Sequence, residues 1–390
     1  MAVIYSENYT IQRRKKQSVT LKTVLYCVSL LPFLGIYALK QLMGETAYAA
    51  YQVIAMILLG MLVLLQSRRV ILNAYVGTVA LLYGWLFLKS AWEHGFSAGI
   101  MVNTCAIIFL ILLIQVDMRE IVGVLSFYFS WILILNLLSL IAGIWTGETM
   151  FFLGGKNAFS IFLIPAMGIV WVDSLNRNGT ISRWVYAFIT IALIEIVWGG
   201  STTGFLVSVV VVLGLAYERK GKLSISFCTW GLVLINIILL WGGRVVLQSS
   251  WWIRIAEALN KDVTLTSRLI IWEETISLLK ESWLTGLGRG SSVVFLSRWG
   301  YYTSTTEVHN VFLELLFQGG IIALFLFGAV FVKSTNKLNV KDPESKVVFL
   351  FLAFQMANGL AESVNNQMML SIYLAMCYAY SHRARFGERK

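Results

Sequence analysis

Apolar runs of about 20 residues follow one another along almost the whole chain, and they limit its fold more than any other feature. The hydrocarbon core of a bilayer, roughly 30 Å thick, requires about 20 apolar residues for each helical crossing. Inside it every backbone polar group must be bonded internally, which favours helices. With 58% hydrophobic and 13% charged residues and a mean hydropathy of +0.75, the chain is predicted to be an all-α, polytopic integral membrane protein.

Twelve of these runs are long enough to be candidate transmembrane helices. They cover about residues 23–39, 48–66, 70–88, 98–116, 121–143, 158–173, 184–199, 203–217, 224–241, 310–332, 347–362 and 367–381. No internal repeat or low-complexity linker divides them, so residues 1–390 are predicted to form a single membrane domain. The four cysteines have no metal-binding spacing and the first run has no cleavage site, which argues against a zinc site and a signal peptide.

The lysines and arginines collect on one side of this predicted topology. With the amino terminus inside, 21 of the 31 fall in inner loops and tails, 3 in short outer loops and 7 in one long outer loop. The positive-inside rule therefore predicts that both termini are cytoplasmic and that the long loop is external. This distribution explains the net charge of +11 without a nucleic-acid partner.

The long loop, residues 242–309, is the one large hydrophilic interruption and is predicted to carry the functional site. Two apolar stripes at helical spacing predict short amphipathic helices at the membrane interface. The first stripe is Trp251, Trp252, Ile255 and Leu259, and the second is Leu269, Trp272, Ile276 and Leu279.

Arg268 stands at the start of the second of these predicted helices. A cation is unfavourable there because the helix dipole places partial positive charge at the amino end. An anionic partner explains the position best, and a cation–π contact with Trp272, four residues further on, is the structural alternative.

His309 stands where the loop re-enters the membrane and is followed by Asn310. A neutral imidazole is well matched to removing a proton from a hydroxyl group near neutral pH, so His309 is a candidate base. The alternative is an interfacial histidine hydrogen-bonded to the backbone.

Several polar groups lie near the outer ends of predicted spans, where they are costly and are therefore candidates to line a cavity. They are Glu195, Glu314, Gln318, Glu362, Asn365 and Asn366. Asn157 begins the sixth span, and Ser201-Thr202-Thr203-Gly204 is the outer turn between the seventh and eighth, which is either part of the same cavity or a plain tight turn. The chain lacks a phosphate-binding GxxxxGK[ST] loop, a GxSxG elbow and an HExxH motif, which argues against nucleotide-driven or metal-dependent chemistry.

Motifs from about residue 150 to residue 330 resemble, in order and in topological side, the bacterial O-antigen ligase and Wzy-type polysaccharide polymerase superfamily. They are Gly154-Gly-Lys156-Asn157, Ser201-Thr-Thr-Gly204, Ser267-Arg268 with Trp272, Leu284-Thr-Gly286-Leu-Gly288, His309-Asn310-x-x-Leu313-Glu314 and Gly319-Gly320-Ile321. The resemblance implies a GT-C-like membrane glycosyltransferase of the bacterial inner (cytoplasmic) membrane. It would transfer a glycan from an undecaprenyl-diphosphate carrier to a sugar hydroxyl, without cofactor or metal, beside a flippase and a chain-length regulator of the same pathway.

Carried over by residue, the resemblance implies that Arg268 holds the diphosphate, that His309 is the base and that Asn310 orients the base or contacts sugar. The remaining candidates for substrate binding are Lys156, Asn157, Glu195, Thr202, Thr203, Arg244, Arg289 and Glu314. The outer turn reads Ser-Thr-Thr-Gly where the family often has Ser-Arg-Thr-Gly. Either Arg244 or Arg289 replaces the missing cation, or the turn binds sugar.

The missing cation and the short chain favour a polymerase of lipid-linked repeat units over a ligase that moves finished glycan to lipid A core or to protein. A secondary transporter or lipid flippase is the alternative from another class, because many spans with buried polar groups suit it. The polar chemistry, however, gathers on one side of the membrane, whereas a transporter needs access from both.

Overall fold

The computed structural model describes residues 20–143, 150–218, 224–242, 249–250, 254, 268–296, 301–364 and 368–382. Its helices are α1 Leu21–Leu30, the 3-10 turn η1 Leu31–Phe33, α2 Tyr37–Met43, α3 Glu45–Leu65, α4 Ala74–His94, α5 Ala98–Ala142, α6 Ala158–Asn178, α7 Arg183–Trp198, α8 Thr202–Glu218, α9 Ile225–Ile237, the π-helix η2 Ile238–Gly242, α12 Arg268–Leu278, α13 Val311–Thr335, α14 Pro343–Asn358 and α15 Met368–Ser381. Its strands are β1 Met150–Phe151, β2 Gly154–Gly155, β3 Val293–Leu296 and β4 Tyr302–Thr305.

The molecule is a helical membrane bundle, as the apolar runs predict. Among the described helices, α3, α4, α5, α6 and α13 are long and apolar enough to cross a bilayer, and α1–η1 with α2 would make a sixth span bent by 91°. Pro32 and Gly35, whose φ is 71°, lie at this bend. Shorter apolar helices cover Thr202–Tyr217, Ile225–Trp241 and Met368–Ser381. The multi-pass architecture is confirmed, whereas twelve spans stay a prediction.

The predicted spans 98–116 and 121–143 form one helix, α5, with a kink at Asp117 in place of the expected loop. Its 45 residues are about twice what one crossing needs. The Asp117 carboxylate lies 2.9 Å from Lys22 Nζ and accepts a hydrogen bond of 2.7 Å from the Tyr26 hydroxyl group. Because α1 supplies these partners, a charged residue remains within the bundle at the kink.

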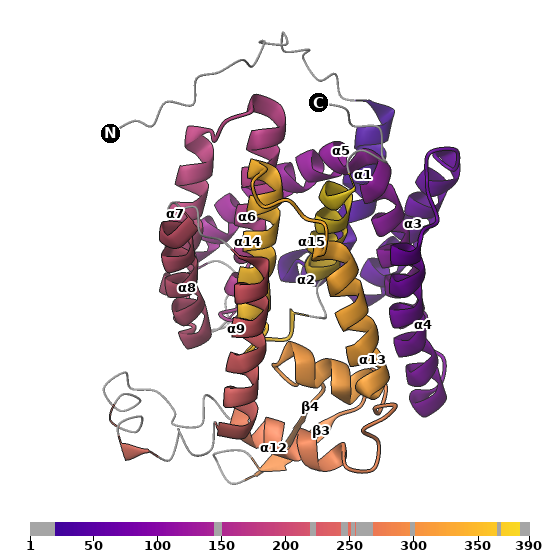
Figure 1. Ribbon diagram of the computed structural model, residues 1–390, viewed down its shortest axis with the longest axis vertical. Coiled ribbons are helices and arrows are strands. Elements are labelled where there is room, and N and C mark those ends of the chain that lie inside the picture. The colour runs from indigo at the N-terminus through magenta and orange to yellow at the C-terminus, as the bar shows by residue number, and fades with distance from the viewer. Residues whose placement is uncertain are drawn as a thin grey trace.

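Helices α6, α14 and α15 form the centre of the bundle. Every residue of α15 from Met368 to Tyr380 is buried, and Tyr373 donates a hydrogen bond to the Pro165 carbonyl oxygen of α6. In Figure 1, α7 and α8 lie to one side of this centre and α3 and α4 to the other. A helix that is apolar around its whole circumference is expected to be buried by its neighbours, as α15 is.

Two short antiparallel hairpins, β1–β2 and β3–β4, are the departure from the all-α prediction. The segment before β3 is pinned to a kink in α13 at Gly320, where φ is 67°. Leu287 N donates to Phe317 O at 2.7 Å and Gly288 N donates to Gln318 O at 3.0 Å. This backbone pairing joins two motifs that the sequence places more than 30 residues apart, and it holds α12, β3 and β4 against one end of the bundle (Figure 1).

Gly320→Ala is expected to destabilise the protein, because a Cβ at this position would lie 2.2 Å from the Leu284 carbonyl oxygen and the positive φ disfavours a side chain. We expect the free energy of unfolding to fall by about 1–3 kcal/mol, which would appear as a lower melting temperature in detergent. Gly328→Ala on the same helix is the matched control, since a Cβ there meets nothing within 4 Å. Equal melting temperatures for the two variants would contradict the proposed packing.

Candidate functional site

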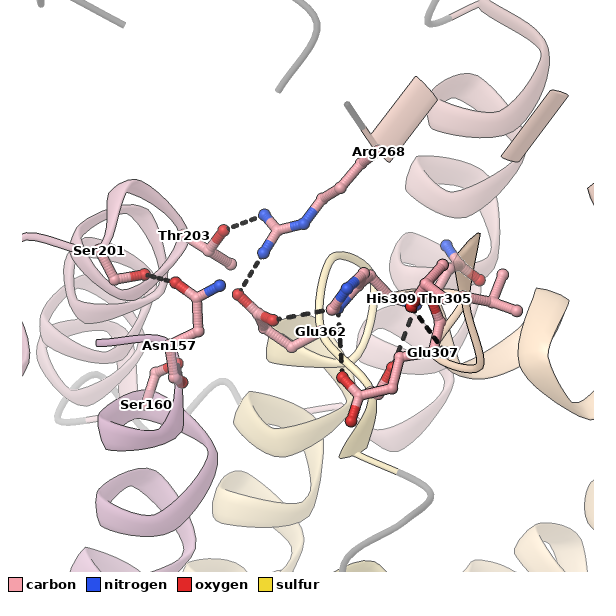
Figure 2. A network of polar contacts seen from close by, with 12 residues as sticks. Asn157, Ser160, Ser201, Thr203, Arg268, Thr305, Glu307, His309 and Glu362 are labelled. Atoms are coloured by element: carbon pink, nitrogen blue, oxygen red, sulfur yellow. Dashed lines mark hydrogen bonds and ion pairs between the residues drawn. The ribbon is translucent and has the colours of Figure 1, made fainter. Parts of the chain in front are cut away.

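The candidate site lies where the start of α12, the end of the loop before α13, the start of α8 and the turn after α14 meet (Figure 2). We call Thr203, Arg268, Glu307, His309 and Glu362 the site cluster. Its members come from four segments that are far apart in the sequence. Tertiary packing, and not a local motif, therefore builds the site.

Arg268 is the first described residue of α12, and only 7% of it is exposed. Its Nη2 atom lies 2.5 Å from Glu362 Oε1, and its Nη1 atom donates to the Thr203 hydroxyl group. The anionic partner that its position calls for is thus present within the protein itself. Figure 2 shows the guanidinium between α8 and the turn after α14, where charge-assisted hydrogen bonds hold its plane.

Glu362 lies in the turn that follows α14 and is 1% exposed. Its second carboxylate oxygen, Oε2, lies 3.6 Å from His309 Nδ1. One carboxylate therefore stands between the arginine and the histidine that the sequence analysis singles out. Removing one partner of a buried ion pair leaves an uncompensated charge, so this contact also contributes to the fold.

His309 has a φ of 56°, and it is the one non-glycine residue with a positive φ in the described part of the chain. Its backbone N–H donates to the Ser363 hydroxyl group at 3.1 Å. Its Nδ1 atom lies 3.9 Å from Glu307 Oε2, is buried, and has no hydrogen-bond partner among the described atoms. A left-handed backbone conformation is uncommon at non-glycine residues, and the residues that adopt it cluster at functional sites.

Asn310 fixes the backbone on the carboxyl side of His309. Its side-chain oxygen caps α13 by accepting hydrogen bonds from Phe312 N and Leu313 N at 3.2 and 3.0 Å. Its amide nitrogen donates to Asn236 Oδ1 at 2.8 Å and to Leu360 O at 3.0 Å. These contacts orient the chain beside the base, and the predicted contact of Asn310 with sugar stays a prediction.

The two predicted outer turns meet beside Arg268. The Ser201 hydroxyl group donates to Asn157 Oδ1 at 2.9 Å, and Gly204 N donates to Ser201 Oγ at 3.1 Å. Thr203, in the same turn, contacts Arg268. Lys156 is exposed and Thr202 is half-buried, and the described contacts do not join either side chain to the site cluster.

Arg289 and Glu314 form a second polar group with Gln318. Arg289 Nε donates to Gln318 Oε1 at 3.1 Å, and Gln318 Nε2 donates to Glu314 Oε1 at 2.9 Å. The Arg289 guanidinium also lies 5.8 Å from the centre of the Tyr83 ring. Glu314 lies in the first turn of α13, where its backbone N–H donates to Asn310 O at 2.8 Å, so the second group adjoins the residue that follows His309.

The remaining predicted residues do not join the site cluster. Glu195 accepts a hydrogen bond of 2.7 Å from Asn136 Nδ2, and Asn136 Oδ1 accepts one of 3.2 Å from Leu153 N. Glu195 therefore supports the turn that leads to Asn157. Arg244 and, of the predicted helix over residues 251–259, all residues but Arg254 lie outside the described residues.

The predicted stripe of Leu269, Trp272, Ile276 and Leu279 agrees in part with the buried face of α12. Trp272 and Leu279 are buried and Leu269 is partly buried, whereas Ile276 is 37% exposed. The buried residues of α12 also include Arg268, which pairs with Glu362. Trp272 keeps its predicted place inside, where its Nε1 donates to Val308 O at 2.9 Å, next to His309.

Sequence reasoning did not select Glu307, and it gave Glu362 no partner and no role beyond that of a polar group that could line a cavity. Glu362 counts among the costly polar groups near span ends, but nothing local relates it to Arg268, which is 94 residues away. Glu307 stands two residues before His309, in a segment without periodicity.

A long apolar groove of about 890 Å³ runs between α9, α12 and α13. Trp230, Leu240, Trp283, Phe312 and Phe331 are among the side chains that line it. Asn236, the partner of Asn310, also lines the groove, so the groove reaches the residue that follows His309. An apolar groove with few polar groups suits a hydrocarbon chain.

Residues 185–328 match the family model described as O-antigen ligase. This match confirms the resemblance to the O-antigen ligase and polymerase superfamily. The matched segment includes Thr203, Arg268, Glu307 and His309, whereas Glu362 and Asn157 lie outside it. No curated protein matches the chain.

Proposed function

We propose that this multi-pass membrane protein, similar to O-antigen ligases over residues 185–328, is a glycosyltransferase that polymerises undecaprenyl-diphosphate-linked repeat units into surface polysaccharide. It would act at the external face of the cytoplasmic membrane, with both termini cytoplasmic. The observation that carries the proposal is the buried contact of Arg268 with Glu362 beside His309, because it places a cation and a base in one small site.

Arg268 would stabilise the leaving group. A diphosphate departs readily only when its growing negative charge is neutralised, and a guanidinium does this with two parallel hydrogen bonds. Burial strengthens such contacts, since the effective dielectric constant is lower than in water. Arg289, hydrogen-bonded to Gln318, would be a second cation.

His309 would act as the general base. The oxygen of the acceptor hydroxyl group attacks the anomeric carbon, the bond between that carbon and the diphosphate oxygen breaks, and the hydroxyl proton passes to the imidazole. The products are a lengthened glycan and undecaprenyl diphosphate. The strained backbone at His309, held by Ser363 and Asn310, would set the direction of the ring.

The apolar groove would hold the isoprenoid chain of the donor. Asn236 lines the groove and bonds to the residue after His309, so a lipid in the groove would lie close to the site. The groove thus supports a lipid-borne donor over a water-soluble one.

A ligase that transfers finished glycan to lipid A core or to protein is the second candidate, and the description of the matched family favours it. The Thr203 hydroxyl group stands beside Arg268 in the turn where the family often has an arginine. This departure from the ligase-like pattern supports the polymerase.

Arg268→Ala and His309→Ala are each expected to abolish elongation when purified protein is incubated with lipid-linked repeat units. General base catalysis contributes about 10²–10⁴-fold, so the loss for His309→Ala should lie in that range. The measurement is the ladder of products on a gel. Glu274→Ala, at an exposed residue of α12 that is not a site candidate, is the comparison. Unchanged ladders in both site variants would refute the assignment.

Repeat units supplied alone distinguish the two candidates. A polymerase should lengthen them without any other acceptor, because one unit accepts the glycan of the next. A ligase should leave them unchanged and should act only when lipid A core or protein is added. Product length by mass spectrometry gives the answer, and elongation that strictly requires the added acceptor would overturn the polymerase proposal.

Gly328→Phe is expected to raise the KM for the donor by filling the groove. Gly328 lines the groove, and a Cβ there meets nothing within 4 Å, so the bulky ring enters without displacing the helix. Gly84→Phe on α4 is the matched control, because its Cβ also meets open space but lies outside the groove. A farnesyl-diphosphate donor should be affected less than the undecaprenyl one. Equal KM values for both variants would contradict a lipid chain in the groove.

A further inference from the structure

One carboxylate group faces both candidate catalytic residues. Glu362 Oε1 lies 2.5 Å from Arg268 Nη2, and Oε2 lies 3.6 Å from His309 Nδ1. The first distance is that of a strong charge-assisted hydrogen bond, and the second is too long for a hydrogen bond. In this arrangement Glu362 neutralises the arginine and leaves the imidazole without a partner.

The His309 imidazole therefore lacks the hydrogen-bond partner that a general base normally has. His309 Nδ1 is buried and lacks a hydrogen-bond partner among the described atoms, although a buried polar atom normally has one. A histidine that takes a proton at Nε2 works best when a carboxylate holds its Nδ1–H, which orients the ring and stabilises the imidazolium that forms. The second nearby carboxylate, Glu307, is 3.9 Å away and about half exposed.

An incoming diphosphate must change this arrangement. Its oxygens compete with Glu362 for the same guanidinium, and the negative charges of phosphate and carboxylate repel each other in a site where few water molecules screen them. Arg268 would exchange one anion for another, so its charge remains compensated throughout. Glu362 needs to move by less than 1 Å toward His309 to form a hydrogen bond, since such bonds are about 2.7–3.2 Å long.

We propose that Glu362 is a positioning residue that donor binding displaces from Arg268 onto His309, so that the base is completed only when the donor is present. The proposal rests on the function proposed above and concerns the regulation of that same site. With Glu362 on Nδ1–H, Nε2 accepts the proton of the acceptor hydroxyl group, and the carboxylate stabilises the resulting imidazolium. Without donor, Arg268 keeps Glu362 away and the base is weak.

Two carboxylates lie near the His309 Nδ1 atom: Glu307, which precedes it in the loop, at 3.9 Å, and Glu362, from the turn after α14, at 3.6 Å. Glu314 follows in the first turn of α13. Arg268, on α12, reaches His309 only through Glu362. Glu362 is thus the one group among the described contacts that bonds to the proposed donor-binding cation and also faces the base.

A purely structural role for Glu362 predicts a different outcome. If the carboxylate only joined α12 to the turn after α14, its loss would lower stability and would weaken donor binding, because Arg268 would be misplaced. Under the proposal, removing its charge strengthens donor binding while it slows the chemical step. The separation of affinity from turnover therefore distinguishes the two roles.

The test is Glu362→Gln, whose amide can still bond to Arg268 but does not compete as an anion. Undecaprenyl diphosphate without glycan is the binding probe. We expect its Kd to fall about tenfold and kcat for elongation to fall about 10²-fold. Glu307→Gln is the matched control and should lower kcat less, with no change in Kd.

Glu362→Asp keeps the experiment decisive if Glu362→Gln does not fold. Its shorter carboxylate still neutralises Arg268 but no longer reaches His309, so Kd should stay within about twofold while kcat falls about 10²-fold. An unchanged kcat in the folded variant, or a weaker Kd for Glu362→Gln, would overturn the proposal. If Arg268→Ala and His309→Ala were also fully active, the proposed function itself would fail. If these two variants were inactive and Glu362→Gln were fully active, only the role of Glu362 would be refuted.

Discussion

The buried ion pair of Arg268 and Glu362 is the contact on which the site depends. Neither charge is tolerable alone where a helical bundle borders a bilayer, because an unpaired buried ion costs several kcal/mol. Together, and with Thr203, they join the start of α12, the start of α8 and the turn after α14. The loop that follows α9 is therefore attached to the bundle by the same side chain that the proposed chemistry uses.

Contacts at the first turn of α13 fix the position of the loop end that carries His309. Asn310 caps the helix and bonds to Asn236 and Leu360, so the residue before it has little freedom. The loop is held a second time where residues 283–288 pair with the kink at Gly320. With both ends pinned, His309 keeps its positive φ at a modest energetic cost, because the surrounding contacts outweigh the local strain.

The sequence predicts what depends on composition and short spacing. Membrane class, the helix at residues 269–279 and the importance of Arg268 and His309 follow from apolar periodicity and from charges in unusual places. The pairing of Glu362 with Arg268 does not follow from the sequence, because the two residues are 94 positions apart and no pattern links them. The burial of Arg268 beside Trp272 is missed for the same reason, since apolar periodicity assumes that charge turns outward. The kink at Asp117 is likewise invisible until Lys22 and Tyr26 are seen to satisfy its carboxylate.

The hydrogen bond between Asn236 and Asn310 connects the apolar groove to the polar residues of the site cluster. On one side of it lies an apolar groove, and on the other lie a guanidinium, carboxylates and an imidazole. A lipid diphosphate has the same division, with an apolar chain joined to a charged head. Under the proposed function, a substrate that lacked either part would meet only one of these two surfaces, and binding energy from the chain would bring the head against Arg268 and offset the cost of displacing Glu362.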